Sequence, residues 1–519
     1  MSRRTAVDLA GPRTPPAPDR RGLWEVVARG LLLLCAAAGL AAIAVCLVTA
    51  ARRVGYPYAL EWLEGNSLVE VHRLLAGEPL YRPPTVGYVA DGYPALYFAA
   101  SASLAGVLGV SYLPLRLVSL TASILCFVLI ARLVQRETAC LATGIAAAGL
   151  YAATYFAAGT WFDLARVDSL FLVFSLAGLY TARWMRRPGG AVAAGLLLAA
   201  AFLTKQSALA EAAAITVALL VDPRRRRLGA LLAATFAGIL GLTTLLWGAV
   251  SHGWYVFYVF EVLSQHSAEP AALTGFWSRY LLPTLGLALG AVLLAVRRAP
   301  LVLALGSLAL TAEGYAALLH TGGAVNNMLP AYAAVALLAG IGMAGPAAAT
   351  RAAASALVLL QILILAASTF APGRVVPTAA DRRVGDQLRA WLSGFGGPVA
   401  VFSDPGLPLL AGLPSVAHQA AASDILRGTS RTAQALLRRS IARAVTEHRF
   451  TAIVVEQPGD LQGFPPDLTR YYRRCPQVLL ADVPGPVFRP VAGLPRVRPM
   501  TLWLPAGGGS CEAAVRRLR

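Results

Sequence analysis

The stretch LLLLCAAAGLAAIAVCLVTA, residues 31–50, contains no charged side chain. About 20 apolar residues in a helix are enough to cross a lipid bilayer. The stretch belongs to a longer apolar run, near residues 24–50, that follows a tail rich in arginine and proline. Because this run is too long for the core of a signal peptide, it predicts an uncleaved membrane anchor whose N-terminus is cytoplasmic.

The rest of the chain repeats this pattern. Of its 519 residues, 57% are hydrophobic and only 14% are charged, a composition too apolar for an ordinary soluble globular protein. Further runs long enough to cross a bilayer lie near residues 113–131, 138–160, 168–184, 190–221, 228–250, 280–296, 299–319, 327–345 and 351–370. The run 190–221 is too long for one helix, so we divide it into a hairpin with TKQS (204–207) at its tip. The sequence therefore predicts a polytopic α-helical membrane protein.

The arginines indicate the orientation. The net charge of +19 comes from short clusters between apolar runs, such as Arg132 with Arg136, residues 183–187 and residues 224–227. The positive-inside rule places such clusters in the cytoplasm. All of them lie there only if the shorter apolar piece 93–110 lies along the outer interface. The prediction is then about eleven crossings of a bacterial cell membrane, an extracytoplasmic C-terminus and no nucleic-acid partner.

The composition becomes mixed beyond about residue 371. Amphipathic, helix-like stretches alternate there with the strand-like runs VAVFS (399–403) and TAIVVE (451–456). Three regions are predicted: a disordered cytoplasmic tail (1–22), a transmembrane domain (23–370) and a soluble extracytoplasmic α/β domain (371–519). Of the six cysteines, only Cys475 and Cys511 lie in the last region, where they could pair if it is extracytoplasmic.

Two carboxylates follow the first apolar run, in YALEWLEGNSL (58–68). If this segment is helical, Glu61 and Glu64 share a face, and together with Glu70 they cannot all face lipid at a reasonable cost. One interpretation is a solvated interfacial helix anchored by Tyr58 and Trp62. The other is a general base beside the membrane.

A second acidic loop, WFDLARVDSL (161–170), carries Asp163, Arg166 and Asp168. These charges either neutralise one another at a helix start or face the first pair across a cleft. Farther along, Lys205 is the only lysine among 45 basic residues. A chain this biased toward arginine is expected to keep a lysine where a compact ammonium is needed, for example on a phosphate. The alternative is a lysine that snorkels from a helix end.

The asparagines are also concentrated near the ends of predicted spans. Only Asn66, Asn326 and Asn327 occur, and their amides could bind sugar hydroxyls or cap helices. The long outer loop 251–279 adds His252, Glu261, His266 and Arg279 among many aromatic residues. This mixture is typical of an amphipathic loop over a lipid-facing cleft, although aromatic residues alone also serve as interface anchors.

The acidic pair is followed by LLAGEPLY (74–81), GYPALYF (92–98), RLVSL (116–120), ARVDSLFL (165–172), FLTKQSAL (202–209) and NNMLPAY (326–332). In this order the motifs resemble the GT-C superfamily, the polytopic glycosyltransferases that use polyprenyl-phosphate sugars. The resemblance is closest to the branch of protein mannosyltransferases and aminoarabinose transferases, which is like glycosyltransferase family 39. Its motifs run from the first outer loop to the asparagine pair, within residues 61–332.

The resemblance implies an enzyme that moves a sugar, with inversion, from a polyprenyl-phosphate donor to an extracytoplasmic glycan, lipid or protein. Relatives carry Asp-Glu in the first loop; the spacing aligns Glu64 with the Glu and places Leu63 at the Asp, so the base is Glu64 or Glu61, with Glu64 preferred. The lipid phosphate would be held by Lys205, Gln206, His252 and Arg279, and the sugar or acceptor would contact Asn66, Tyr93, Asn326 and Asn327. Some relatives use a divalent metal, so a role for Mg²⁺ or Mn²⁺ stays open.

Two other classes of protein compete with this interpretation. A transporter or lipid-linked sugar flippase typically has ionisable groups near the bilayer midplane and repeated halves. This chain places its charges at the outer ends of the spans and has no recognisable repeat. An inactive scaffold that binds cell-wall polymer would tolerate the loss of both carboxylates of the first loop.

Overall fold

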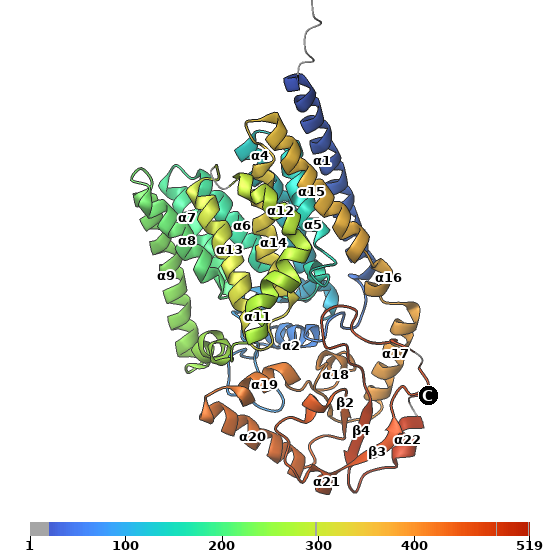
Figure 1. The fold of residues 1–519 in the computed structure, drawn as a ribbon. Coiled ribbons are helices and arrows are strands. Elements are labelled where there is room, and N and C mark those ends of the chain that lie inside the picture. Colours follow the sequence, from blue (N-terminus) through green and yellow to red (C-terminus); the bar gives the residue numbers. More distant parts are fainter. Residues whose placement is uncertain (1–19, 296–297, 484, 517, 519) are drawn as a thin grey trace, which may run out of the picture.

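The computed structural model describes residues 20–295, 298–483, 485–516 and 518. Most of the predicted cytoplasmic tail, residues 1–19, lies outside the described residues. The described chain forms a bundle of helices and a C-terminal α/β unit, residues 372–516, at one end of the bundle (Figure 1). The N-terminal end of α1 lies at the opposite end of the bundle (Figure 1).

Seven helices among the described residues are long and apolar enough to cross a membrane. They are α1 (Arg20–Arg53), α4 (Tyr112–Thr138), α9 (Arg226–Val250), α13 (Leu301–Leu319), α15 (Ala348–Thr369), the run of α11 (Pro270–Gly275), η4 (Phe276–Leu281) and α12 (Leu282–Ala295), and the run of η5 (Val325–Met328) and α14 (Leu329–Gly342). These helices confirm the predicted polytopic class.

Four shorter helices lie in the same bundle: α5 (Leu141–Ala153), α6 (Asp168–Trp184), α7 (Pro188–Thr204) and α8 (Ala208–Val221). Counted with the seven, they make eleven helices in the described bundle, a number equal to that of the predicted crossings, but by length and composition only the seven can each cross a membrane. Their ends near the C-terminal unit stop early, at the loops 154–167 and 205–207. These loops carry the second acidic motif and the single lysine.

Helix α3 (Leu96–Leu108) begins and ends on the side of the C-terminal unit. It lies between α2 (Glu64–Leu75) and the start of α4, and both of these contact that unit. A Cβ placed on Gly65 would lie 2.4 Å from Oδ1 of Asp404, and the Tyr112 hydroxyl donates to the same Oδ1 at 3.3 Å. The chain therefore enters and leaves α3 on one side of the bundle, as expected for a segment that does not cross.

The C-terminal unit is built on a four-stranded sheet of order β1-β2-β4-β3. Strands β1 (Val399–Val401) and β2 (Ala452–Val455) are parallel and fully buried, while β4 (Thr501–Pro505) pairs antiparallel with both β2 and β3 (Tyr472–Val478). The predicted strand-like runs are thus the two parallel strands, β1 at the edge of the sheet and β2 inside it. A disulfide joins Cys475 of β3 to Cys511 at the start of α22.

The other described elements are shorter or surround these two parts. In the bundle they are η1 (Trp161–Asp163), α10 (Trp254–Val256), η2 (Phe257–Val262) and η3 (Leu263–Gln265). In the C-terminal unit they are α16 (Pro372–Val375), α17 (Ala379–Ser393), α18 (Gly406–Leu410), α19 (Gln419–Arg427), α20 (Arg431–Thr446), η6 (Pro458–Leu461), α21 (Leu468–Tyr471) and α22 (Cys511–Arg516). Helices α2 and α19 lie where the bundle and the unit meet (Figure 1).

Candidate active site

A cavity of about 1540 Å³ lies between the bundle and the C-terminal unit. Ligand sites in proteins typically have volumes of about 300–1,000 Å³, so this cavity has room for more than one small ligand. Its charged lining residues are Glu61, Asp91, Arg166, Lys205, Glu313, Asp424, Arg427 and Arg496, together with His266 and His320. Carboxylates and cations from both parts of the chain therefore face one space.

Glu61 is a buried carboxylate that lines this cavity from the loop between α1 and α2. Its Oε2 accepts a hydrogen bond from the Leu63 amide at 3.0 Å, whereas its Oε1 finds no partner among the described residues. Burial raises the pKa of Glu61 to about 8, although the nearby Arg166 guanidinium opposes this effect. A cavity-lining carboxylate with a raised pKa and one unpaired oxygen has the properties of a general base at neutral pH.

Glu64 is equally buried but does not line the cavity. Arg116 donates to both of its oxygens, at 3.0 and 2.7 Å, and the amides of Leu60 and Ala165 donate at 2.6 and 2.7 Å. Burial alone would raise the pKa of Glu64, but the Arg116 charge and these hydrogen bonds lower it. Its lone pairs are occupied, so the geometry reverses the preference for Glu64 and makes Glu61 the candidate base.

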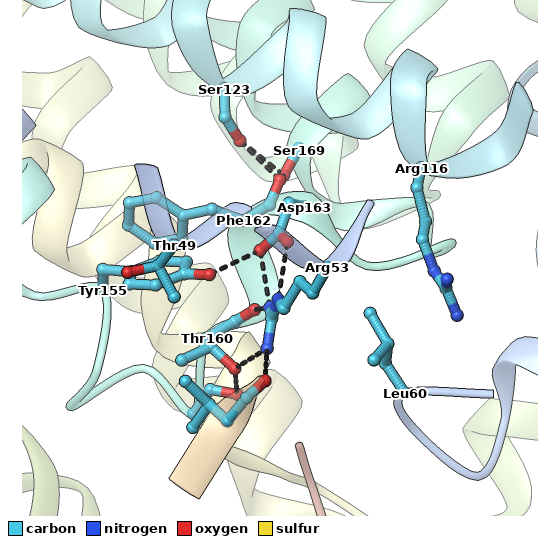
Figure 2. A network of polar contacts seen from close by, with 12 residues as sticks. Thr49, Arg53, Leu60, Arg116, Ser123, Tyr155, Thr160, Phe162, Asp163 and Ser169 are labelled. Atoms are coloured by element: carbon cyan, nitrogen blue, oxygen red, sulfur yellow. Dashed lines mark hydrogen bonds and ion pairs between the residues drawn. The ribbon is translucent and has the colours of Figure 1, made fainter. Parts of the chain in front are cut away.

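Asp163 also has a structural environment. Arg53 donates to its two oxygens at 2.7 and 2.6 Å, and the Tyr155 hydroxyl donates at 2.9 Å. Figure 2 shows the Arg53 guanidinium directed at Asp163, with Thr160 bound to the same guanidinium. The aspartate is fully buried and does not line the cavity. It anchors the second acidic loop to the end of α1 and does not face Glu61 across a cleft.

Arg166, from the same loop, does line the cavity. Its side chain makes no hydrogen bond to the described residues, and its buried Nε lacks a partner. The guanidinium lies 5.9 Å from the ring centre of Tyr93 and 5.8 Å from that of Trp161, and both rings also line the cavity. Arg166 is thus a cation that a ligand can reach beside Glu61.

Lys205 lies at the centre of a second polar cluster. Its Nζ is 3.2 Å from Oδ1 of Asp168, 3.2 Å from Oδ1 of Asn327 and 3.6 Å from Oε1 of Glu313. The Asn326 amide donates to the same Oδ1 of Asp168 at 3.0 Å. Lys205, Glu313 and both asparagines line the cavity, and Asp168 supports them from behind.

Glu313 had not been singled out from the sequence, although a signal was present. It is the only charged side chain in the apolar run 301–319. Ser207 donates to its Oε1 at 2.7 Å, and its Oε2 is buried without a partner in the described chain. Asp91 was also missed: it lines the cavity, accepts from the Asn66 amide at 2.6 Å and keeps a buried Oδ2 unpaired.

The remaining predicted residues divide into two groups. Gln206 lines the cavity, with its Nε2 bound to the carbonyls of Gly92 and Val259 at 2.8 and 3.1 Å. Asn66 supports Asp91 without lining the cavity. His252 and Arg279 are exposed and lie outside the lining. The structure therefore does not bring these last two residues to the site.

Two other histidines occupy the place expected for His252. His266 and His320 line the cavity with their ring centres 5.4 Å apart. Nε2 of His266 lies 3.3 Å from Oδ1 of Asp424 on α19. This contact connects the long loop of the bundle to the C-terminal unit at the cavity wall.

The donor set does not fit a divalent metal. No group of three or more His, Cys, Asp or Glu side chains that could hold a metal ion occurs among the described residues. Three carboxylates of the acidic loops are paired with cations, Glu64 with Arg116, Asp163 with Arg53, and Asp168 with Lys205, which leaves Glu61 without such a pair in the described chain. We therefore derive no step through Mg²⁺ or Mn²⁺.

These features define a polytopic membrane protein whose cavity, with acidic and cationic walls, is closed by an α/β unit. No protein-family model matches the sequence, and a search of curated proteins gives no match. The crystal structure of ArnT from Cupriavidus metallidurans in the apo state is similar to this chain with a TM-score of 0.57 at 14% identity, over 89% of this chain and 97% of that chain.

The same ArnT bound to undecaprenyl phosphate gives a TM-score of 0.55 at 11% identity over the same shares. An archaeal oligosaccharyltransferase, AglB from Archaeoglobus fulgidus in complex with an inhibitory peptide and a dolichol-phosphate, gives 0.48 at 11% identity, over 84% of this chain and 72% of that chain. The likeness to ArnT over nearly its whole length confirms the predicted GT-C-like fold.

Proposed function

We propose that this protein is a membrane glycosyltransferase that moves a sugar from a polyprenyl-phosphate donor to an extracytoplasmic acceptor, with inversion. The observation that carries the proposal is the shared cavity of Glu61, Arg166 and Lys205. The fold supports it, since one of the similar ArnT structures is bound to undecaprenyl phosphate.

The chemistry requires few groups. A glycosyl phosphate already has a good leaving group, so no general acid is needed; a base must lie near the acceptor hydroxyl and cations near the departing phosphate. Oε1 of Glu61 takes the proton of the hydroxyl, whose oxygen bonds to the anomeric carbon while the bond from that carbon to the phosphate oxygen breaks. The product polyprenyl phosphate keeps the electron pair of the broken bond.

Two cations serve the phosphate in different ways. Arg166 has no hydrogen-bonded partner within the described chain and can give its guanidinium to a phosphate oxygen. Lys205 already forms ion pairs with Asp168 and Glu313. A phosphate at Lys205 therefore binds in addition to these carboxylates or replaces one of them. We assign Arg166 the main role and Lys205 a supporting one.

The donor chain is proposed to lie against the bundle. Beside Glu313, helices α8 and α13 line the cavity with small and apolar side chains, which include Leu209, Ala210, Ala213, Ala312 and Ala316. Such a wall suits a hydrocarbon chain, because burying apolar surface there removes it from water at no polar cost.

The proposed location is a bacterial inner membrane, with the N-terminus cytoplasmic, residues 23–370 in the membrane and residues 371–519 extracytoplasmic. The arginine clusters of the α4–α5, α6–α7 and α8–α9 connections support this orientation, because each connection is one crossing away from the C-terminal unit. The disulfide between Cys475 and Cys511 supports it too, because disulfides persist in oxidising compartments.

The test uses the purified full-length protein in nanodiscs with a panel of radiolabelled polyprenyl-phosphate hexoses and pentoses and a mixture of glycan, lipid and peptide acceptors. We expect cleavage of one donor, with release of polyprenyl phosphate, and loss of this cleavage in Glu61→Gln. The matched control is Glu447→Gln, because Glu447 is exposed on the C-terminal unit and outside the cavity lining. A transporter or flippase would instead move the intact donor across a vesicle membrane; that result, without cleavage, would overturn the proposal.

A further inference from the structure

The C-terminal unit contributes hydrogen-bonding side chains to the cavity. They include Gln419, Ser423 and Asp424 from α19, followed by Gln462. Nε2 of Gln419 donates to the Ser423 hydroxyl at 2.9 Å, and that hydroxyl donates to Oε1 of Gln462. Amides and hydroxyls that both donate and accept complement the hydroxyl groups of a sugar. The same part of the cavity lining also carries the apolar side chains of Ala420, Ala421 and Ile425, which can pack against the apolar face of a sugar ring.

A set of buried polar atoms lacks partners close to Glu61. Nε1 of Trp161, Nε of Arg166 and Oε1 of Glu61 are all buried without a hydrogen bond to the described residues, and all three residues line the cavity. Trp161 is only 3% exposed. Native proteins rarely leave such atoms unpaired. Two donors and one acceptor within one corner match a ligand that carries several hydroxyls.

Gly493 connects this corner to the C-terminal unit. A Cβ placed on Gly493 would lie 2.8 Å from Cγ of Glu61 and 3.4 Å from Cζ2 of Trp161. The neighbouring amide of Ala492 donates to the Leu60 carbonyl at 2.9 Å. Because glycine has no side chain, the unit's backbone can touch both residues. Gly493, the three residues with unpaired atoms and the polar side chains of the C-terminal unit therefore line the same cavity.

Aromatic side chains border the same corner. Trp62 lines the cavity one residue after Glu61, and its ring centre lies 4.8 Å from that of His418 in the C-terminal unit. Tyr93 lines it beside Arg166. A sugar ring offers an apolar face and polar edges, so it can use aromatic rings and hydrogen-bonding groups of one site together.

From this arrangement we propose that the acceptor is a saccharide, bound under the C-terminal unit between Trp161 and the polar wall of Ser423 and Gln462. One of its hydroxyls lies at Oε1 of Glu61. This inference rests on the proposed glycosyltransferase function and adds the acceptor class. In the transfer, that hydroxyl loses its proton to Glu61 and bonds to the anomeric carbon of the donor, which loses the phosphate.

The experiment supplies the protein in nanodiscs with the donor that it cleaves and with one of three classes of acceptor. These are p-nitrophenyl glycosides, a serine- and threonine-rich peptide, and diacylglycerol. We expect transfer to a glycoside. Trp161→Phe and Gln462→Ala should each raise the KM for that glycoside by about fivefold to tenfold, the usual effect of one lost hydrogen bond. The KM for the donor should stay unchanged. The matched control is Trp277→Phe, because Trp277 is exposed and does not line the cavity.

The outcomes separate the two proposals. If donor is cleaved but the sugar passes only to the peptide or to diacylglycerol, the saccharide assignment fails and the glycosyltransferase function stands. An unchanged glycoside KM in both Trp161→Phe and Gln462→Ala, or an increase confined to the donor KM, overturns the assignment as well. If no donor is cleaved under any condition, the proposed function itself fails.

Discussion

Replacing Glu61 by glutamine tests the proposed base most directly. The amide keeps the size of the side chain and can still accept the Leu63 hydrogen bond, but it cannot take a proton. Loss of a positioned general base typically lowers a rate by about 10²–10⁴-fold. We therefore expect Glu61→Gln to reduce sugar transfer by at least about a hundredfold.

The pH dependence gives this prediction a magnitude. Burial raises the pKa of Glu61 to about 8. About a tenth of the molecules then carry the ionised base at pH 7 and about nine tenths at pH 9, so kcat/KM of the wild-type protein should rise about tenfold between these values. The residual rate of Glu61→Gln should not change over the same range. The assay is the initial rate of polyprenyl-phosphate release, measured from pH 6 to pH 9.5.

Stability provides the control for misfolding. The carboxyl of Glu61 holds its proton more tightly in the folded chain, with a pKa of about 8, than in the unfolded chain, with a pKa of about 4.3. The folded state thus binds more protons between these values, and Glu61 makes the free energy of unfolding fall as the pH rises from about 4 to 8. Glu61→Gln should therefore have a higher Tm than the wild-type protein at pH 8. A wild-type rate that is constant from pH 6 to pH 9, or undiminished turnover in Glu61→Gln, would refute the assignment.

Three further substitutions test the rest of the site. Glu64→Gln should lower the free energy of unfolding by about 3–5 kcal/mol in denaturation experiments, because it leaves a buried guanidinium without its counter-charge; an unchanged Tm would contradict this. Lys205→Met should weaken binding of polyprenyl phosphate more than it raises the acceptor KM, and equal effects on both would count against a role at the phosphate. Gly493→Ala should lower kcat by displacing Glu61, whereas Gly485→Ala, at the same φ of +66° but with open space around it, should not; equal losses would point to backbone strain alone.

The roles of the two glutamates could not be separated from the sequence. Motif spacing aligns Glu64 with an acidic residue of the relatives. Whether the Glu64 carboxylate is free to act as a base, however, depends on Arg116, which lies 52 positions away in the chain and binds it. In the same way, Asp163 is occupied by Arg53, 110 positions earlier. Both arginines reach their partners only because α1 and α4 pack beside the acidic loops. No local pattern records such a pairing.

The long outer loop, residues 251–279, also shows what the sequence does not reveal. It was expected to supply cations to the site, but His252 and Arg279 are exposed, whereas His266 reaches the cavity. All three lie in a segment whose path is set by its contacts with α13 and α19, and composition does not reveal that path. Lys205 could be identified in advance, because its rarity and its place at the tip of a hairpin are properties of the chain itself.

The sequence by itself determined the membrane class and the apolar segments that form the bundle, because hydropathy acts on each segment through its own transfer between water and lipid. Only the tertiary structure decided which carboxylate is free, which cations face the cavity and how the C-terminal unit completes it. The physical reason is that a buried polar atom is satisfied by whatever neighbour the packing brings within hydrogen-bonding distance, and those neighbours come from distant parts of the chain.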